Sequence, residues 1–149
     1  MTEYTLRKAT SHDFDLSFEI RKNALGEYVS QTWGWDEDWQ LKYHRQDFNT
    51  DILQIIEVNS KPAGSLEVYT ENNHIVVSGL YIIDKYQNLQ IGSRIRSSII
   101  KDASLIPANV KLQVLKVNHK AKAFYERIGF KVYNETEQHF QMIYYFSDK

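Results

Sequence analysis

Apolar and polar positions divide the first third of the chain into a short strand and two helices. Residues Tyr4 to Lys8 alternate in the manner of a strand. Thr10 with Asp13 three positions later is a helix-capping pattern, and apolar side chains then recur at helical spacing to about Val29. A second helix is predicted from Glu37 to about Phe48.

Three strands are predicted in the middle of the chain. They cover Ile52 to Val58, Pro62 to Thr70 and His74 to Ile83. The segments between them, Asn59 to Lys61 and Glu71 to Asn73, are short and rich in turn-forming residues. Because such short connections join neighbouring antiparallel strands, we expect an antiparallel meander.

The last third of the chain begins with a helical period. Ile91, Ile95, Ile99 and Ala103 lie four residues apart, which predicts a helix that Pro107 ends. One strand, one helix and two final strands follow: Val110 to Val117, Ala121 to Ile128, Lys131 to Tyr133 and Gln138 to Phe146.

The order of these elements predicts a mixed sheet covered by helices, which is an α/β fold of the mixed α+β type. With 149 residues, the chain has the length of one ordinary domain. We therefore expect a single domain over residues 1–149.

Composition narrows the chemistry. The chain has no cysteine, which excludes disulfides, thiolate metal sites and cysteine nucleophiles. The five histidines show no metal-ligand spacing, so we expect no metal site. No apolar run approaches the roughly 20 residues of a membrane span, and the start of the chain lacks a signal-peptide pattern. We expect a soluble, cytoplasmic protein.

Charge is distributed unevenly along the chain. The formal net charge of −1 gives no general attraction to nucleic acid or to a membrane, and neither is expected as a partner. Up to Asp51, however, acidic residues outnumber lysine and arginine, whereas basic residues dominate from Lys85 to Lys131. The first region suits a cation and the second a polyanion, unless both are ordinary solvated surfaces.

The segment Leu80 to Ser93 is an apolar strand that ends in a polar turn and opens directly into a helix. A helix start presents unpaired N–H groups and the positive end of the helix dipole, which together favour phosphate binding. Every strand-to-helix turn has some of this character, so the physical signal alone favours an ordinary turn over a phosphate site.

Two motifs in this half of the chain resemble those of the GNAT superfamily of N-acetyltransferases. Gln87-Asn88-Leu89-Gln90-Ile91-Gly92 is similar to its Q/R-x-x-G-x-G/A motif, except that Gln90 stands where the family has its first glycine. The segment from Asn118 to Phe130 is similar to the signature N-x-x-A-x-x-x-Y-x-x-x-G-F, and all its marked residues are present.

The resemblance implies a GNAT-type fold, with a mostly antiparallel sheet of about seven strands and about four helices. It implies an acetyl-CoA-dependent N-acetyltransferase that binds acetyl-CoA where the strand ending near Ile82 separates from the strand ending near Val117. The cofactor-binding residues that it implies, together with a lysine from the basic region, are Tyr81, Ile82, Gln87, Gln90, Ile91, Gly92, Ser93, Asn118 and Lys122.

For catalysis, the resemblance implies that Tyr125 is the general acid that protonates the CoA thiolate, the alternative being a packing role on its helix. An attacking amine must lose a proton, because only its neutral form is nucleophilic. Glu67 is our first candidate for the base, followed by Glu71 and His74; each has an ordinary surface role as the alternative.

The acceptor amine is expected to bind in the first third of the chain. Aromatic faces and carboxylates gather there, and together they suit a cationic amine. Trp39 and Phe48 are interpreted as core. The predicted acceptor-binding residues are Glu27, Trp33, Trp35 and Glu37.

The acceptor is expected to be a primary amine of a small molecule or a peptide. The main alternative is a non-catalytic acyl-CoA-binding or interaction module on the same fold. A nucleotide-phosphate binder is a weaker alternative, because the turn lacks the lysine and hydroxyl of a P-loop. The aromatic strand Met142 to Phe146 is compatible with a homodimer, although such a strand is first of all core.

Overall fold

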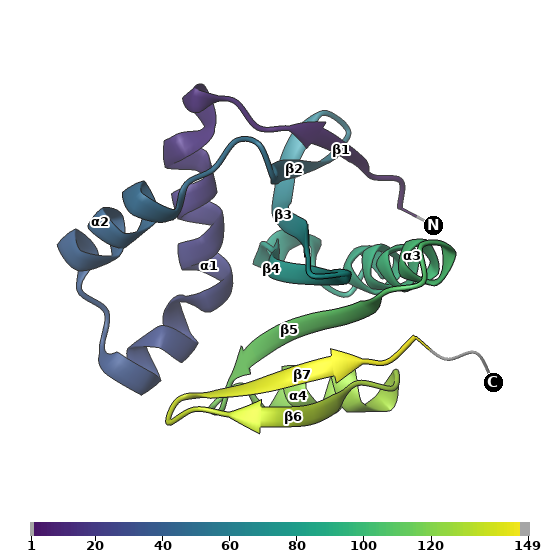
Figure 1. The fold of residues 1–149 in the computed structure, drawn as a ribbon. Helices are drawn as coiled ribbons and strands as arrows, with labels where there is room; N and C mark the ends of the chain where they lie inside the picture. The colour runs from purple at the N-terminus through teal and green to yellow at the C-terminus, as the bar shows by residue number, and fades with distance from the viewer. Residues whose placement is uncertain (1, 147–149) are drawn as a thin grey trace.

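The computed structural model describes residues 2–146 and shows a seven-stranded sheet with helices on both faces (Figure 1). No helix in these residues combines the length and apolarity needed to cross a bilayer. The mixed, mostly antiparallel fold predicted from the sequence is confirmed. In chain order the elements are β1 (Thr5–Lys8), the 3-10 turn η1 (Ser11–Asp13), α1 (Phe14–Trp33), α2 (Glu37–Asp47), β2 (Leu53–Val58), β3 (Lys61–Glu71), β4 (His74–Ile82), the 3-10 turn η2 (Asp84–Tyr86), α3 (Ile91–Leu105), β5 (Asn109–Leu115), α4 (His119–Arg127), β6 (Lys131–Glu135) and β7 (His139–Tyr144).

The strand order is β1-β2-β3-β4-β5-β7-β6, and every neighbouring pair is antiparallel except β4 and β5. That parallel pair is short, because its ladder runs only from His74 opposite Asn109 to Val76 opposite Lys111. Beyond this point the two strands separate, as Figure 1 shows. The sheet therefore opens between its two halves.

The predicted hairpin turns have the geometry that their residues favour. Asn59 and Ser60 have φ values of 52° and 65°, and Asn72 and Asn73 have 51° and 66°. Two successive residues with positive φ characterise the two-residue turns whose twist matches that of the flanking strands. The first helix extends one turn beyond the predicted end, to Gly34 with a φ of 80°.

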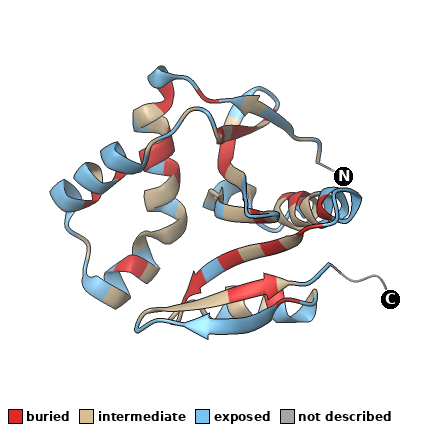
Figure 2. Cartoon of the chain, viewed as in Figure 1, coloured by how far each residue is buried: buried red, intermediate tan, exposed pale blue. Residues whose placement is uncertain are grey.

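The alternation of side chains along the inner strands places apolar residues on both faces of the sheet. Leu53 and Ile55 of β2 pack with Ile20 of α1 on one face. Ile56 packs with Ile91 of α3 on the other face. In Figure 2 buried residues follow the inner strands, whereas β6 and the outer side of α2 are exposed. Helix α1 thus covers one face, with α2 packed against it, and α3 covers the opposite face.

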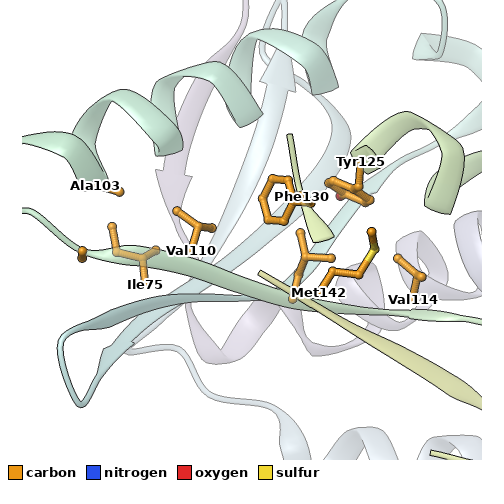
Figure 3. Close-up of a cluster of buried hydrophobic side chains, with 9 residues drawn as sticks. Ile75, Ala103, Val110, Val114, Tyr125, Phe130 and Met142 are labelled. Carbon is orange, nitrogen blue, oxygen red and sulfur yellow. The ribbon is translucent and has the colours of Figure 1, made fainter. Parts of the chain in front are cut away.

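A second core cluster fills the half of the sheet that contains β5 and β7. Val110 and Val114 of β5 meet Met142 of β7, and the rings of Tyr125 and Phe130 close the cluster (Figure 3). Because β7 lies between β5 and β6, both of its backbone edges are paired within the chain. The homodimer stays a prediction.

The interpretation of Trp39 as a core residue is wrong, since its side chain is 58% exposed. Helix α2 turns Gln40 and His44 toward α1 instead, and the His44 ring nitrogen Nε2 lies 2.8 Å from Ser17 Oγ. Trp39 is one position from this face and therefore points about 100° away around the helix. Phe48 does pack inward, against Phe14.

Candidate active site

A cleft of about 1030 Å³ lies where β4 and β5 separate. Residues Val77 to Ile82 of β4 and Leu112 to Leu115 of β5 form its floor. The start of α3 and one side of α4 line one half of it, while α1 and α2 line the other half. A cleft of this volume accommodates an extended ligand together with a second, smaller molecule.

The open edge of β4 presents main-chain groups to this cleft. Ile83 N–H donates to the carbonyl of Ala63 at 3.0 Å, which makes this a hydrogen-bonded pair of the antiparallel ladder. Since such pairs alternate, Leu80 and Ile82 direct their N–H and C=O groups away from β3 and toward the gap. The side-chain amide of Gln87 donates to the Ile82 carbonyl at 2.9 Å, on that open side.

In the described part of the chain, the first turn of α3 leaves backbone N–H groups without protein acceptors at the cleft. Its N-cap residue Gln90 provides no side-chain acceptor, and the turn contains no acidic residue. The N–H groups of Ile91, Gly92 and Ser93 have no acceptor within residues 2–146, and all three residues line the cleft. Free N–H groups and the helix dipole together favour a phosphate here.

Gln90 adopts a left-handed backbone conformation, which glycine reaches without steric cost. Its φ of 67° lies in the left-handed region, which costs a residue with a side chain about 1–2 kcal/mol. The turn therefore keeps the shape that exposes the N–H groups of α3, despite the departure from the family motif.

Three basic side chains line the α3 and α4 half of the cleft: Arg96, Lys120 and Arg127. Within residues 2–146 none of them has a carboxylate oxygen at 4.0 Å or less. Lys122, which was predicted to bind the cofactor, lies outside the cleft lining and pairs with Glu126 at 2.9 Å. The unpaired cations suit a ligand that carries several phosphates.

Tyr125 and Asn118 of α4 both reach the cleft. Asn118 caps the helix, because its Oδ1 accepts the N–H of Ala121 at 3.1 Å. Tyr125 is only 7% exposed, and its hydroxyl oxygen accepts the Nε–H of Arg96 at 3.0 Å. The Arg96 guanidinium also lies over the Tyr125 ring, 5.1 Å from its centre.

Glu67 lies in a small cavity of about 40 Å³ beside the cleft. Its Oε1 accepts the hydroxyl of Ser78 at 2.7 Å, where a bulge makes Ser78 the extra residue of β4. Burial raises the pKa of Glu67, and the Ser78 hydrogen bond only partly opposes this. Five residues line both spaces, so the small cavity adjoins the cleft: Arg21, Asp47, Ser78, Gly79 and Tyr81.

Comparison with known proteins identifies the family of this chain. A family model described as "Acetyltransferase (GNAT) domain" matches residues 25–147. The chain belongs to the GNAT acetyltransferases. Among curated protein sequences, none matches it. The predicted family, enzyme class and co-substrate are confirmed: the chain is an N-acetyltransferase, and acetyl-CoA is the acetyl donor.

Solved structures share the fold of this GNAT domain at low sequence identity. The PaiA N-acetyltransferase from Thermoplasma acidophilum, solved in complex with coenzyme A, has a TM-score of 0.76 and 17% identity over 96% of this chain and 99% of that chain. The ribosomal-protein-S18-alanine N-acetyltransferase from Escherichia coli has a TM-score of 0.71 and 16% identity over 99% and 96%. An acetyltransferase from Thermus thermophilus has a TM-score of 0.70 and 17% identity over 96% and 98%.

The predicted acceptor residues of the GNAT domain divide between the cleft and the outer surface. Trp33 lines the cleft and its ring meets that of His139, 5.9 Å between centres. Trp35 donates from Nε1 to Glu37 at 2.8 Å, and Glu37 pairs with a lysine of α1, all outside the cleft lining. Glu27 is exposed and is not part of the cleft lining either.

The other base candidates lie farther from the cleft than Glu67. Glu71 is exposed at the end of β3, and His74 lies where β4 and β5 are still paired. Neither residue lines the cleft or the small cavity.

Sequence reasoning missed three groups that the GNAT domain brings to the cleft: Arg21, Arg96 and the main chain of Leu80. Arg96 follows Gly92 by four residues, a spacing that places both on one face of the predicted helix and could have been used as a signal. In the structure the two are close, since a Cβ on Gly92 would lie 2.9 Å from Arg96 Nη1. Arg21 had no such signal, since its position depends on how α1 packs against the sheet.

Proposed function

We propose that this acetyltransferase moves the acetyl group of acetyl-CoA to a primary amine of a small molecule or peptide by direct attack on the thioester. The observation that carries the proposal is the cleft between the separated ends of β4 and β5. Free amides and cations line its α3 and α4 half, and aromatic and acidic residues line its α1 and α2 half. We take residues 1–149 as one catalytic domain.

The α3 and α4 half would hold acetyl-CoA, which supplies an acetyl group activated as a thioester. Main-chain groups of Leu80 and Ile82 on the open edge of β4 would bind the pantetheine arm. The amides of Ile91 to Ser93 would bind the pyrophosphate. Lys120 and Arg127 would lie near the remaining phosphate charge. The Thermoplasma acidophilum relative was solved in complex with coenzyme A, which supports a CoA ligand on this fold.

Two side chains would move protons. Glu67 would take a proton from the acceptor amine, whose pKa of about 10.4 leaves it mostly protonated at neutral pH. A raised pKa suits a base that works near neutrality. Tyr125 would give its hydroxyl proton to the departing thiolate. A main-chain N–H at the open edge of β4, near Ile82, would donate to the carbonyl oxygen as its negative charge grows.

The test is a turnover assay with acetyl-CoA and a set of small-molecule and peptide amines, in which thiol release and the mass of the acetylated product are both followed. Product formation with a mass gain of one acetyl group supports the proposal. Acetyl-CoA binding by calorimetry without transfer to any amine would instead support the non-catalytic acyl-CoA-binding module. The ribosomal-protein alanine in the name of the Escherichia coli relative makes a peptide N-terminus one acceptor to include.

A further inference from the structure

Four basic side chains line the cleft, and only three of them lie where acetyl-CoA would bind. Arg96, Lys120 and Arg127 lie on α3 and α4, where acetyl-CoA would bind. Arg21 lies on α1, in the half assigned to the acceptor. A cation in that half needs another explanation.

Arg21 is held in place by neutral groups, and it lowers the pKa of the Tyr81 hydroxyl against the larger effect of burial. Its Nη1 donates to Oε1 of Gln40 at 3.0 Å, and Gln40 is only 4% exposed. The guanidinium also lies over the ring of Tyr43, 5.2 Å from its centre. A guanidinium carries five N–H donors, so these contacts orient the group and leave most donors unused.

The unused donors of Arg21 remain accessible from the cleft that Arg21 lines. Within residues 2–146, the buried side-chain polar atom that lacks a partner is His74 Nδ1, so no unpaired nitrogen of Arg21 is sealed in the core. Arg21 lines both the cleft and the small cavity that contains Glu67. A bound acceptor could therefore reach the Arg21 guanidinium and the Glu67 carboxylate together.

A purely structural role would be met by a direct ion pair, and among residues 2–146 Arg21 forms none. Neither Glu67 nor Asp47 lies within 4.0 Å of it, although the charge of Arg21 lowers the pKa of Glu67 from a distance. Other cations of the chain do form such pairs: Arg7, Lys22, Lys116 and Lys122.

We infer that the acceptor carries a carboxylate beside its amine and that Arg21 binds this carboxylate. The inference rests on the proposed function and names its substrate class, an amine of the amino-acid type. The planar fork of a guanidinium matches a carboxylate with two parallel hydrogen bonds. A purely cationic acceptor would be repelled by Arg21, whereas an amino acid places its amine toward Glu67 and its carboxylate toward Arg21.

The experiment compares three acceptors that differ only at the carboxylate: L-phenylalanine, L-phenylalaninamide and 2-phenylethylamine. The same comparison is then repeated with amino acids that have small or acidic side chains. Because the intrinsic reactivity of these amines differs, the deciding quantity is how each kcat/KM changes on mutation. Arg21→Gln should lower kcat/KM for the amino acid about 10-fold to 100-fold and leave the other two nearly unchanged.

Two further variants keep the test specific. Arg21→Lys retains the charge without the fork and should recover part of the loss. Arg45→Gln removes an exposed arginine of α2 that stacks on Phe14 outside the cleft lining, and it should change none of the three rates. If Arg21→Gln fails to fold, calorimetry on the wild-type complex with CoA decides, because the amino acid should bind about 10-fold more tightly than its amide.

Each contrary result has one meaning. Equal losses for all three acceptors in Arg21→Gln, or tighter binding of the amide, would overturn the carboxylate inference while the proposed function stands. Preference for a peptide without a nearby carboxylate would overturn it as well. Transfer to no acceptor at all, with acetyl-CoA bound, would overturn the proposed function and this inference with it.

Discussion

At the scale of single residues, Arg96 and Tyr125 act as a pair that joins α3 to α4. The Tyr125 oxygen accepts the Arg96 Nε–H, so one lone pair is occupied and the hydroxyl hydrogen must point elsewhere. No acceptor for that hydrogen exists within residues 2–146, while the residue lines the cleft. Arg96 is therefore a positioning residue in the proposed reaction.

Tyr125→Phe is expected to lower kcat about 10²-fold and to leave measurable activity, because a thiol with a pKa of about 8.5 leaves fairly well without help. Arg96→Gln should lower kcat less, and the two effects should not add in the double variant. Arg94→Gln is the control, because Arg94 donates to the Thr2 carbonyl and lies outside the cleft lining. Complete loss of activity in a folded Tyr125→Phe would contradict the acid role.

Glu67→Gln should abolish the acidic limb of the kcat/KM profile. Burial raises the pKa of Glu67 above 4.5, so wild-type activity should rise as the pH passes that raised pKa. Because the pKa of Glu67 is higher in the folded than in the unfolded state, its protonated form adds to the free energy of unfolding. This contribution is lost as the pH rises through the folded-state pKa. Glu67→Gln should therefore be at least as stable as the wild type at neutral pH, measured by thermal unfolding. Glu71→Gln is the matched control and should keep the limb.

At the scale of elements, the close approach of β3 and β4 shapes the floor of the cleft. A Cβ on Gly64 would lie 2.1 Å from the Tyr81 carbonyl oxygen, far inside van der Waals contact. Gly64 sits opposite Ile82, next to the main-chain groups that face the gap. Glycine at this position lets β4 remain paired with β3 up to the point where the cofactor would bind.

Gly64→Ala should destabilise the protein by roughly 2–3 kcal/mol, because backbone would have to move to admit the methyl group. It should also weaken acetyl-CoA binding, since Ile82 would shift with β4. Gly26→Ala is the matched control: in α1 the nearest atom would be 3.9 Å away, and alanine should stabilise the helix by about 1 kcal/mol. Urea unfolding of both variants measures the contrast, and equal stability of the two would refute the account.

At the scale of the whole molecule, the uneven distribution of charge along the sequence corresponds to two differently charged sides of one cleft. The basic second half of the chain contributes three cations from α3 and α4. The acidic first part contributes Asp36 and Asp47 on the far side, together with the exposed stack of Trp39 and Tyr43. The splayed pair β4 and β5 lies between them, so an acetyl donor and an acceptor would meet over the open edge of β4.

Acetyl-CoA binding should weaken as sodium chloride is raised, because exposed charges are screened beyond about 8 Å at physiological ionic strength. Binding of S-acetyl-N-acetylcysteamine, which has the thioester without phosphates, should not respond. Lys120→Ala and Arg127→Ala should weaken acetyl-CoA binding and reduce its salt dependence. Lys122→Ala, on the same helix but paired with Glu126, should do neither. Calorimetry measures the binding of both ligands to the wild type and of acetyl-CoA to the three variants. If Lys122→Ala weakens acetyl-CoA binding as much as Lys120→Ala and Arg127→Ala do, Lys122 belongs to the cofactor site after all.

Residues that are close together in the sequence determined most of the helices and strands and the two family motifs. The asparagine-rich turns, the apolar alternation of β2 and the period of α3 each depend on residues close together in sequence. The segment from Asn118 to Phe130 combines an N-cap, a short helix with the buried Tyr125 and, after the end of that helix, Gly129 with a φ of 113°. Such features could be predicted because neighbours along the chain supply the physics.

Tertiary structure decided which side chains face the cleft. Trp39 lies exposed along the cleft instead of in the core, and Arg21 lines the cleft as well, because α1 and α2 pack through a polar interface of Ser17, Gln40 and His44, which a search for apolar faces does not find. Lys122 is drawn into an ion pair by its own helix. The early end of the β4 and β5 ladder creates the cleft itself. These outcomes depend on contacts between segments far apart in sequence, so no local pattern carries them.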